Sequence, residues 1–321
     1  MRRGVAALAF AALLAGCDVA SSASVTPTTA PAVVDPRVAT TTARVARPRA
    51  PTGDSVETIT HDGVARRYLL HVPTDLAADA TVPLVLVLHG AGGEPEDIEA
   101  GSGWNALADE RGLVVAYPQG DGGDWNAGAC CGVAVREGHD DVGFLDALID
   151  HLDGFAQVDP ARVVVVGHSN GGMMAYRLAC DPGAKVFGLA SVAGTNMAGC
   201  PPAHSVSFLE IHGTGDRVVP YGGGSTPESQ AAGLPPMTPV ELSVDWMVDA
   251  LGCETAPQEA TVSKTTTQTW SACRDGTKVG FVTLTGSGHS WPNGRAFDAT
   301  AAIADFFFGD VRSTSASDTT G

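Results

Sequence analysis

Residues 163–172 read Val-Val-Val-Val-Gly-His-Ser-Asn-Gly-Gly, and this stretch decides the fold. Four consecutive valines predict a strand that is buried on both faces, as in a parallel sheet. Residues 173–179, Met-Met-Ala-Tyr-Arg-Leu-Ala, predict a helix directly behind the turn. The turn is too tight for side chains at Gly167 and Gly171. We therefore expect it to lift the Ser169 hydroxyl out of the sheet to a helix N-terminus, where backbone N–H groups favour negative charge.

The Gly-x-Ser-x-Gly pattern is weak evidence by itself, because a chain with 39 glycines matches it by chance about 0.3 times. A glycine-rich turn with a bystander serine is one alternative. A chymotrypsin-like protease is another, but that fold is all-β and its His and Asp precede its Ser. Here a strand enters the turn, a helix leaves it and candidate partners follow, so the pattern favours a nucleophilic serine on an α/β scaffold.

Strand and helix patterns alternate over residues 55–309, which we expect to form a single domain without internal repeats. Besides the valine strand and its helix, strands are predicted at residues 56–60, 66–72, 83–88, 113–117, 189–193, 206–211 and 280–285. Helices are predicted at residues 96–111, 141–155, 240–251 and 297–308. This alternation predicts an α/β fold with a mostly parallel, doubly wound sheet. Ligands of such sheets bind beyond the C-terminal ends of the strands.

A serine needs a base to take its proton, and the base needs an acid to hold its tautomer. His289 follows the predicted strand 280–285 on a glycine-rich loop, so it is the candidate base. Asp216 follows the predicted strand 206–211 and is the candidate acid. A surface-loop histidine and a turn aspartate are the structural alternatives. The order Ser169, Asp216, His289 favours catalysis.

A tetrahedral oxyanion needs two backbone donors. The N–H of Asn170, next after the serine, and that of Ala91, after the strand 83–88, are the candidates, although the second loop could equally be a plain turn. Trp125 and Trp291 lie on loops at the same predicted end of the sheet and, with His168, are candidates for substrate binding. Loop tryptophans are as often plain packing.

The composition sets limits on the partners. The 321 residues carry a formal charge of −17 and 44% are hydrophobic, which suits one domain with a sizeable core. Nucleic acid is excluded as an expected partner, because phosphate binding needs clustered Lys and Arg. We expect a monomer that acts on a small or oligomeric substrate.

The N-terminus has the pattern of a targeting segment. Residues 1–16 combine Arg2 and Arg3 with a short apolar run and end before Cys17 in Leu-Ala-Gly-Cys, which resembles a bacterial lipobox. An ordinary secretory signal is the alternative. We expect removal of residues 1–16, a lipid anchor at Cys17, a disordered tether over residues 17–54 and a disordered tail over residues 310–321. The predicted location is extracytoplasmic, as a cell-envelope lipoprotein or secreted protein.

Six further cysteines suit an oxidising compartment. Six allow 15 connectivities, so the sequence does not settle the pairing. The predicted topology makes Cys180–Cys200 feasible, and Cys253 with Cys273 is a plausible second pair. The adjacent Cys130 and Cys131 are left as a vicinal disulfide or two thiols. No Cys-x-x-Cys or His-x-x-x-His spacing appears, so no metal site is predicted.

Several stretches together resemble the family of polyhydroxybutyrate depolymerases and feruloyl esterases, including mycobacterial lipoproteins of that group. The first three are Leu-His-Gly-Ala-Gly-Gly from Leu88, Asp-Trp-Asn-Ala-Gly-Ala-Cys-Cys-Gly from Asp124 and Asp-Asp-Val-Gly-Phe from Asp140. The other three are Gly-His-Ser-Asn-Gly-Gly-Met from Gly167, His-Gly-Thr-Gly-Asp from His212 and Gly-His-Ser-Trp-Pro from Gly288. The resemblance implies an α/β-hydrolase fold, hydrolysis of esters without a cofactor, and a triad of Ser169, Asp216 and His289.

The resemblance leaves the ester open, because that family divides among polyester, phenolic and acetyl substrates. Two other readings stay in view. One is a peptidase or thioesterase on the same fold. The other is a non-catalytic binding lipoprotein of the cell envelope, which explains the anchor but not the combination of serine turn, acid, histidine and oxyanion loop.

Overall fold

The computed structural model describes residues 47–77, 79–155, 157–254 and 256–309. The predicted signal segment, the lipidation of Cys17, most of the predicted tether and the tail over residues 310–321 lie outside this part. Within it, no helix is both long enough and apolar enough to cross a membrane.

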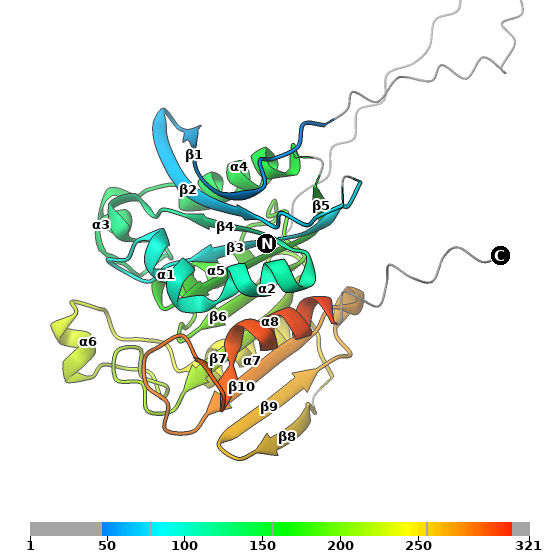
Figure 1. Cartoon of the computed structure of the whole chain (residues 1–321). Coiled ribbons are helices and arrows are strands. Elements are labelled where there is room, and N and C mark those ends of the chain that lie inside the picture. The colour runs from blue at the N-terminus through cyan, green and yellow to red at the C-terminus, as the bar shows by residue number, and fades with distance from the viewer. Residues whose placement is uncertain (1–46, 78, 156, 255, 310–321) are drawn as a thin grey trace, which may run out of the picture. The chain divides into compact units, whose positions relative to one another are not determined.

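A ten-stranded sheet forms the centre of the domain, with the strand order β1-β2-β4-β3-β5-β6-β7-β10-β9-β8 (Figure 1). The strands from β4 to β10 in this order run parallel, and antiparallel pairs close both edges. The strand bounds are β1 Gly53–His61, β2 Val64–Val72, β3 Val82–Leu88, β4 Val114–Pro118, β5 Val158–His168, β6 Gly188–Val192, β7 Ser207–Gly213, β8 Gln258–Val262, β9 Thr265–Trp270 and β10 Val279–Leu284. Two short strands, β11 Asn293–Gly294 and β12 Phe297–Asp298, pair separately.

Helices cover both faces of the sheet, as Figure 1 shows. Their bounds are α1 Pro95–Ser102, α2 Trp104–Arg111, α3 Gly132–Glu137, α4 Asp141–Asp153, α5 Asn170–Ala179, α6 Pro227–Ala231, α7 Val240–Ala250 and α8 Ala299–Phe308. Helices α4, α5 and α7 pack into the hydrophobic core on one face. Helices α1, α2 and α8 pack into the core on the other face. The predicted doubly wound α/β sheet is confirmed.

The central strand β5 shows why a run of valines is needed there. Val163 and Val165 contribute to one core, whereas Val164 and Val166 contribute to the other. Because successive side chains of a strand point to opposite faces, a strand covered by helices on both sides must be apolar at every position.

The structure corrects several predicted boundaries. The predicted helix over residues 96–111 is two helices, because Gly103 adopts φ of 79° between α1 and α2. The tether was expected to reach residue 54, but β1 begins at Gly53. Ala50 is buried and exchanges two backbone hydrogen bonds with the Gln157 side chain. Residues 47–54 therefore belong to the folded domain.

Three disulfides are present among the described residues. Cys180–Cys200 and Cys253–Cys273 are confirmed. Cys130 and Cys131 are bonded to each other, so of the two alternatives left open the vicinal disulfide is the one formed.

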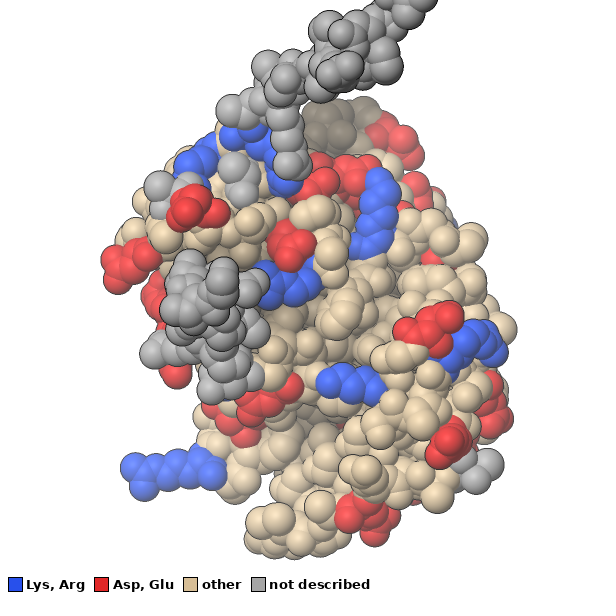
Figure 2. Space-filling model, turned by 90° about the vertical axis from the view of Figure 1, so that its right-hand side faces the viewer, with Lys and Arg blue, Asp and Glu red and all other residues tan. Residues whose placement is uncertain are grey.

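Charged side chains are scattered over the face of the molecule that Figure 2 shows. On the face drawn in Figure 2, acidic and basic residues are interspersed among other residues, and the basic ones do not join into a continuous patch.

Candidate active site

The turn between β5 and α5 holds Ser169 in a conformation that is rare for a residue with a side chain, with φ of 55° and ψ of −117°. A Cβ atom at Gly167 would lie 2.2 Å from the Gly171 carbonyl carbon, and one at Gly171 would lie 2.5 Å from the Leu88 carbonyl oxygen. Both positions therefore require glycine, as the sequence predicts. The serine is fixed at the N-terminus of α5, at the C-terminal edge of the sheet.

Ser169, His289 and Asp216 meet at this edge although they lie far apart in the sequence. The His289 Nε2 atom is 2.9 Å from the Ser169 Oγ atom. The His289 Nδ1 atom is 2.7 Å from the Asp216 Oδ2 atom. Ser169 follows β5, Asp216 follows β7 and His289 follows β10, so three parallel strands of one sheet deliver the three side chains to the same edge.

The Asp216 carboxylate is held on both oxygens. Its Oδ1 atom accepts the N–H groups of Val218 at 2.8 Å and Val219 at 2.9 Å, which leaves Oδ2 for His289. Burial raises the pKa of Asp216, but the hydrogen bond and charge of His289 and the two N–H groups outweigh this, so its pKa lies below the ordinary value. An ionised carboxylate only accepts, so His289 carries its proton on Nδ1 and presents Nε2 as the acceptor for the serine hydroxyl.

Two further histidines surround the site and stay neutral. Burial lowers the pKa of His168 to about 3, with a smaller effect from His289. Burial also lowers the pKa of His212 to about 4, although Asp216 opposes the shift. The His168 ring centroid lies 4.9 Å from that of His289. As neutral rings, these two histidines add no positive charge beside the triad.

The loop after β3 lies directly against the serine. A Cβ atom at Gly90 would be 3.3 Å from the Ser169 Cβ atom, so only a glycine-sized residue leaves this approach unhindered. Ala91 follows in the exposed turn that the Gly93 N–H closes onto the Gly90 carbonyl. Asn170 opens α5 on the other side of the serine. Asn170 thus adjoins Ser169 in the chain, and Ala91 follows the glycine that lies against the serine.

Two side chains that the sequence analysis did not assign hold this loop. His89 is 1% exposed. Its Nδ1 atom is 2.8 Å from the Gly90 carbonyl and its Nε2 atom accepts the Gly120 N–H at 2.9 Å. Asp124 accepts the Gly92 N–H at 3.2 Å with one oxygen and the Val133 N–H at 3.0 Å with the other. The only sequence signal for His89 is its position before the Gly-Ala-Gly-Gly run, and the only one for Asp124 is its position in the Asp-Trp-Asn run.

The prediction that Trp125 lines a substrate pocket is wrong. Its side chain is completely buried, and its Nε1 atom donates to the His89 carbonyl at 3.0 Å. The Asn170 side chain in turn exchanges two hydrogen bonds with the Trp125 backbone. Trp291 is half-buried, donates to Thr300 and packs against the core on the α8 face. His168 is half-buried beside the triad.

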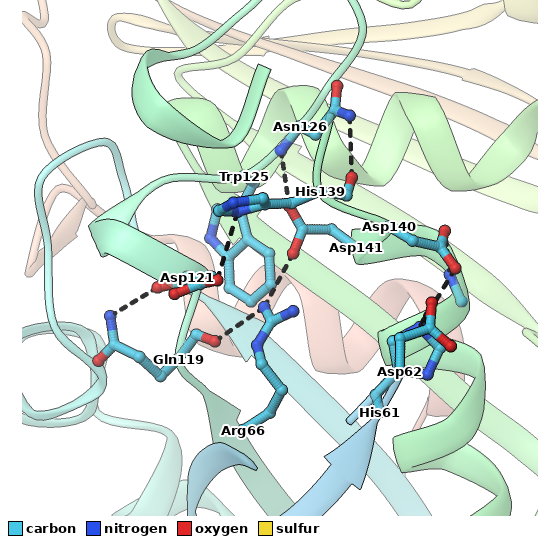
Figure 3. A network of polar contacts seen from close by, with 12 residues as sticks. His61, Asp62, Arg66, Gln119, Asp121, Trp125, Asn126, His139, Asp140 and Asp141 are labelled. Atoms are coloured by element: carbon cyan, nitrogen blue, oxygen red, sulfur yellow. Dashed lines mark hydrogen bonds and ion pairs between the residues drawn. The ribbon is translucent and has the colours of Figure 1, made fainter. Parts of the chain in front are cut away.

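One group of three metal-ligating side chains occurs among the described residues, away from the triad. The ligand atoms of His61, Asp62 and Asp140 lie within 4.8 Å of one another (Figure 3). His61 Nε2 is 3.1 Å from Asp140 Oδ2, and Asp140 Oδ1 caps α4 by accepting the Gly143 N–H. These bonds alone account for the positions of His61 and Asp140, so the group is a link between the β1–β2 hairpin and α4.

Comparison with known proteins finds relatives that are named as esterases. NocK of Nocardia uniformis subsp. tsuyamanensis, named as an esterase, is 34% identical over 308 residues, which cover 89% of each chain. Feruloyl esterase B of Piromyces equi is 30% identical over 241 residues, which cover 72% of this chain and 44% of that one. The bifunctional acetylxylan esterase/xylanase XynS20E of Neocallimastix patriciarum is 28% identical over 231 residues, which cover 71% of this chain and 31% of that one.

The comparison of structures agrees on the fold. An acetyl xylan esterase from Aspergillus awamori superposes with a TM-score of 0.57 at 16% identity, over 79% of this chain and 98% of that chain. No protein-family model matches the sequence. The chain thus spans most of NocK but less than half of the two relatives with polysaccharide-related names.

Proposed function

Because this chain belongs to the feruloyl esterase and polyhydroxybutyrate depolymerase-like family of α/β-hydrolases and is a carboxylic ester hydrolase, we propose that Ser169, His289 and Asp216 form its catalytic triad. The observation that carries the proposal is the continuous hydrogen-bond chain from the serine hydroxyl to the buried carboxylate, at 2.9 and 2.7 Å. The alternative, a serine without a catalytic role in a glycine-rich turn, does not account for either hydrogen bond.

In the proposed reaction, the Ser169 Oγ atom attacks the ester carbonyl carbon while His289 Nε2 takes its proton. Collapse of the tetrahedral adduct expels the alcohol, which receives that proton, and leaves an acyl group on the serine. A water molecule then repeats the attack with His289 as base, and the carboxylic acid leaves. Asp216 holds the imidazole and stabilises its positive charge without being protonated.

The backbone N–H groups of Asn170 and Ala91 are the proposed oxyanion donors. Asn170 is the first residue of α5, where a helix N-terminus favours negative charge. The close approach of Gly90 to Ser169 supports a donor from the next residue, Ala91. Removal of one such donor in other hydrolases lowers turnover by about 10²–10³.

We propose short-chain, feruloyl and hydroxybutyrate-type oligomeric esters as substrates. The names of the relatives support phenolic and acetyl esters, and the motif resemblance supports the hydroxybutyrate type. His168 and Trp291 are the side chains that we propose contact the substrate. Both are half-buried; the His168 ring lies beside that of His289, and Trp291 follows His289 by two residues in the sequence.

The proposed location is extracytoplasmic, with a lipid on Cys17 as the membrane anchor and a monomeric catalytic domain on a tether. Three disulfides support an oxidising compartment, because they persist there and are rare in the cytosol.

The test is a substrate panel with a matched variant. Purified protein is assayed with p-nitrophenyl esters of increasing chain length, methyl ferulate, a hydroxybutyrate oligomer, a peptide amide and an acyl thioester, each beside Ser169→Ala. We expect ester turnover that the substitution abolishes, and a fluorophosphonate probe bound to Ser169 alone. Near-unchanged ester hydrolysis by Ser169→Ala, or a preference for the amide or thioester, contradicts the proposal.

A further inference from the structure

A carboxyl group that takes no part in the proposed triad is completely buried behind the serine turn. It belongs to Glu210 on β7, which is 0% exposed. Strand β7 lies next to β6 in the sheet (Figure 1), and the register places Ser191 of β6 directly beside Glu210. On its other side the register places Phe281 of β10. Glutamate is almost never fully buried unless it is paired, so the partners of this carboxyl decide its role.

Glu210 has one hydrogen bond and no positive charge to pair with. The Tyr176 hydroxyl, from α5, donates to Glu210 Oε2 at 3.0 Å. The Glu210 Oε1 atom is buried without a hydrogen-bond partner among the described residues, and so is the Ser191 Oγ atom. No Lys or Arg in the described part of the chain bonds to this carboxyl. An ionised carboxylate with one hydrogen bond is costly in a protein core, and such a group takes up a proton instead.

The other titratable groups around Glu210 are neutral as well. Burial raises the pKa of Tyr176 well above its ordinary value and also raises that of Tyr221, whereas it lowers the pKa of His212 on β7 to about 4. Helix α7 packs on the same side of the sheet with uncharged buried side chains, and its carboxylates are exposed. Burial therefore raises the pKa of Glu210 well above its ordinary value, and the hydroxyls of Ser191 and Tyr176 oppose the rise only in part.

A proton on Glu210 Oε1 accounts for both buried oxygens that lack a partner. A protonated carboxyl has one O–H donor, and the Ser191 hydroxyl beside it can accept. Neutral Glu210 then accepts from Tyr176 through one oxygen and donates to Ser191 through the other. The carboxyl thus joins helix α5 to strand β6.

Helix α5 and strand β6 hold the serine turn between them. The Ser169 N–H donates to the Val192 carbonyl at 2.8 Å, one residue after Ser191. A Cβ atom at Gly172 would lie 2.7 Å from the Ser191 Oγ atom, and one at Gly194 would lie 2.5 Å from it. The Ser191 hydroxyl is therefore enclosed by the backbone around the serine, and a shift of this hydroxyl displaces that backbone.

We propose that Glu210 is a positioning residue for Ser169, kept as a neutral carboxylic acid that donates to Ser191 and accepts from Tyr176. The inference rests on the proposed triad and adds a residue that acts on it from behind. A glutamine has nearly the same shape and also combines a donor with an acceptor, so it can replace the neutral acid, whereas methionine can do neither. The effect belongs to kcat, because a completely buried side chain cannot touch the substrate.

Infrared difference spectroscopy tests the protonation state without reference to catalysis. Spectra are recorded at pH 8, where Asp146, whose pKa burial raises to about 6, is ionised. We expect the spectrum of the wild type minus that of Glu210→Gln to show the C=O stretch of a protonated carboxyl. The same subtraction with the exposed control Glu254→Gln should show the bands of an ionised carboxylate. Carboxylate bands in the Glu210→Gln subtraction overturn the proposal.

A second arm tests positioning through kcat and KM for p-nitrophenyl butyrate at pH 8. The proteins are the wild type, Glu210→Gln, Glu210→Met, Ser191→Ala and the control Glu254→Gln, and circular dichroism and melting temperature verify their folding. We expect Glu210→Met and Ser191→Ala to lower kcat about tenfold at an unchanged KM, because a small displacement of the nucleophile is enough. Glu210→Gln should keep most of the wild-type kcat, and the control should match the wild type.

Ser191→Ala decides this arm where Glu210→Met does not fold, because it removes a single hydroxyl. An unchanged kcat in a folded Glu210→Met or Ser191→Ala overturns the proposal. A change confined to KM, or a loss in Glu210→Gln as large as in Glu210→Met, does so as well. Fluorophosphonate labelling of the same samples reports on the proposed triad separately, since label on a residue other than Ser169 contradicts the triad whatever the infrared spectra show.

Discussion

At the scale of single residues, Asp216 shows how one carboxylate sets the chemistry of the site. Its two oxygens are divided between backbone N–H groups and His289, so it fixes the imidazole tautomer and its orientation together. We expect Asp216→Asn to lower kcat by about 10⁴, because an amide that donates to Nδ1 forces the wrong tautomer. The measurement is hydrolysis of p-nitrophenyl butyrate. The exposed Asp249→Asn is the control, and a loss below tenfold at Asp216 argues against the triad.

His212 links the site to the stability of the fold. It is 1% exposed and burial lowers its pKa to about 4, whereas an unfolded chain restores about 6.5. At a pH between these two pKa values, His212 binds a proton in the unfolded state but not in the folded state. The free energy of unfolding therefore falls as the pH is lowered from 6.5, by up to about 1.4 kcal/mol per pH unit, and levels off below 4.

The corresponding measurement is urea unfolding at pH 7, 6 and 5. His212→Asn should give a shallower dependence on pH than the wild type, whatever its effect at pH 7. Exposed His151→Asn should leave the dependence unchanged. His168, with a pKa lowered to about 3, contributes in the same sense and remains in all three proteins. Equal slopes for the wild type and His212→Asn contradict the assignment.

At the scale of elements, Asp124 ties the loop after β3 to the start of α3. Asp124 offers one oxygen to the Gly92 N–H and the other to the Val133 N–H at the start of α3. An amide has only one acceptor oxygen, so Asp124→Asn must release one of the two. We expect kcat to fall about 10²-fold with little change in KM, as a small displacement of a donor does. Exposed Asp79→Asn is the control, and a change confined to KM contradicts this role.

The disulfide Cys253–Cys273 joins the segment after α7 to the segment after β9, across 20 residues of sequence. A cross-link of this length restricts the unfolded chain and is expected to contribute about 3 kcal/mol. We expect the double variant Cys253→Ala/Cys273→Ala to lose about that much in urea unfolding and to keep its ester hydrolysis, since the bridge lies outside the triad. An unchanged unfolding midpoint under oxidising conditions contradicts the expectation.

The sequence predicts well those elements whose own residues show a clear pattern of apolar side chains or glycines. The valine run and its glycines specify both the strand β5 and the turn at Ser169, because β5 needs apolar side chains on both faces and only glycine fits at positions 167 and 171. The β8–β9 hairpin was not predicted, since every residue of β8 is exposed and carries no apolar period. The pocket-lining role of Trp125 failed for the opposite reason. Trp125 lies on a loop, and its side chain belongs to the core because Phe144 and His89 pack against it from distant segments of the chain.

At the scale of the whole molecule, the predicted triad depends on topology more than on local sequence. Asp216 and His289 were found because each follows a strand of one parallel sheet, and parallel strands end at the same edge. The cavity of about 530 Å³ between the start of α4 and the end of α5, which Asn126 and Arg177 line in part, was not predicted by that reasoning. Its walls come from α4, α5 and two loops, and no sequence motif connects these segments.

The charge of the molecule bears on how it would stay at a membrane. A formal charge of −17 opposes attraction to an anionic lipid surface, and no described helix spans a bilayer. We predict that the lipid proposed on Cys17 holds the protein at a membrane. Two acyl chains give stable anchoring that salt does not weaken, unlike an electrostatic contact. We expect the wild type to stay with membranes in high salt and Cys17→Ser to be soluble or unprocessed. Release of the wild type by salt, or the absence of fatty-acid label, contradicts the anchor.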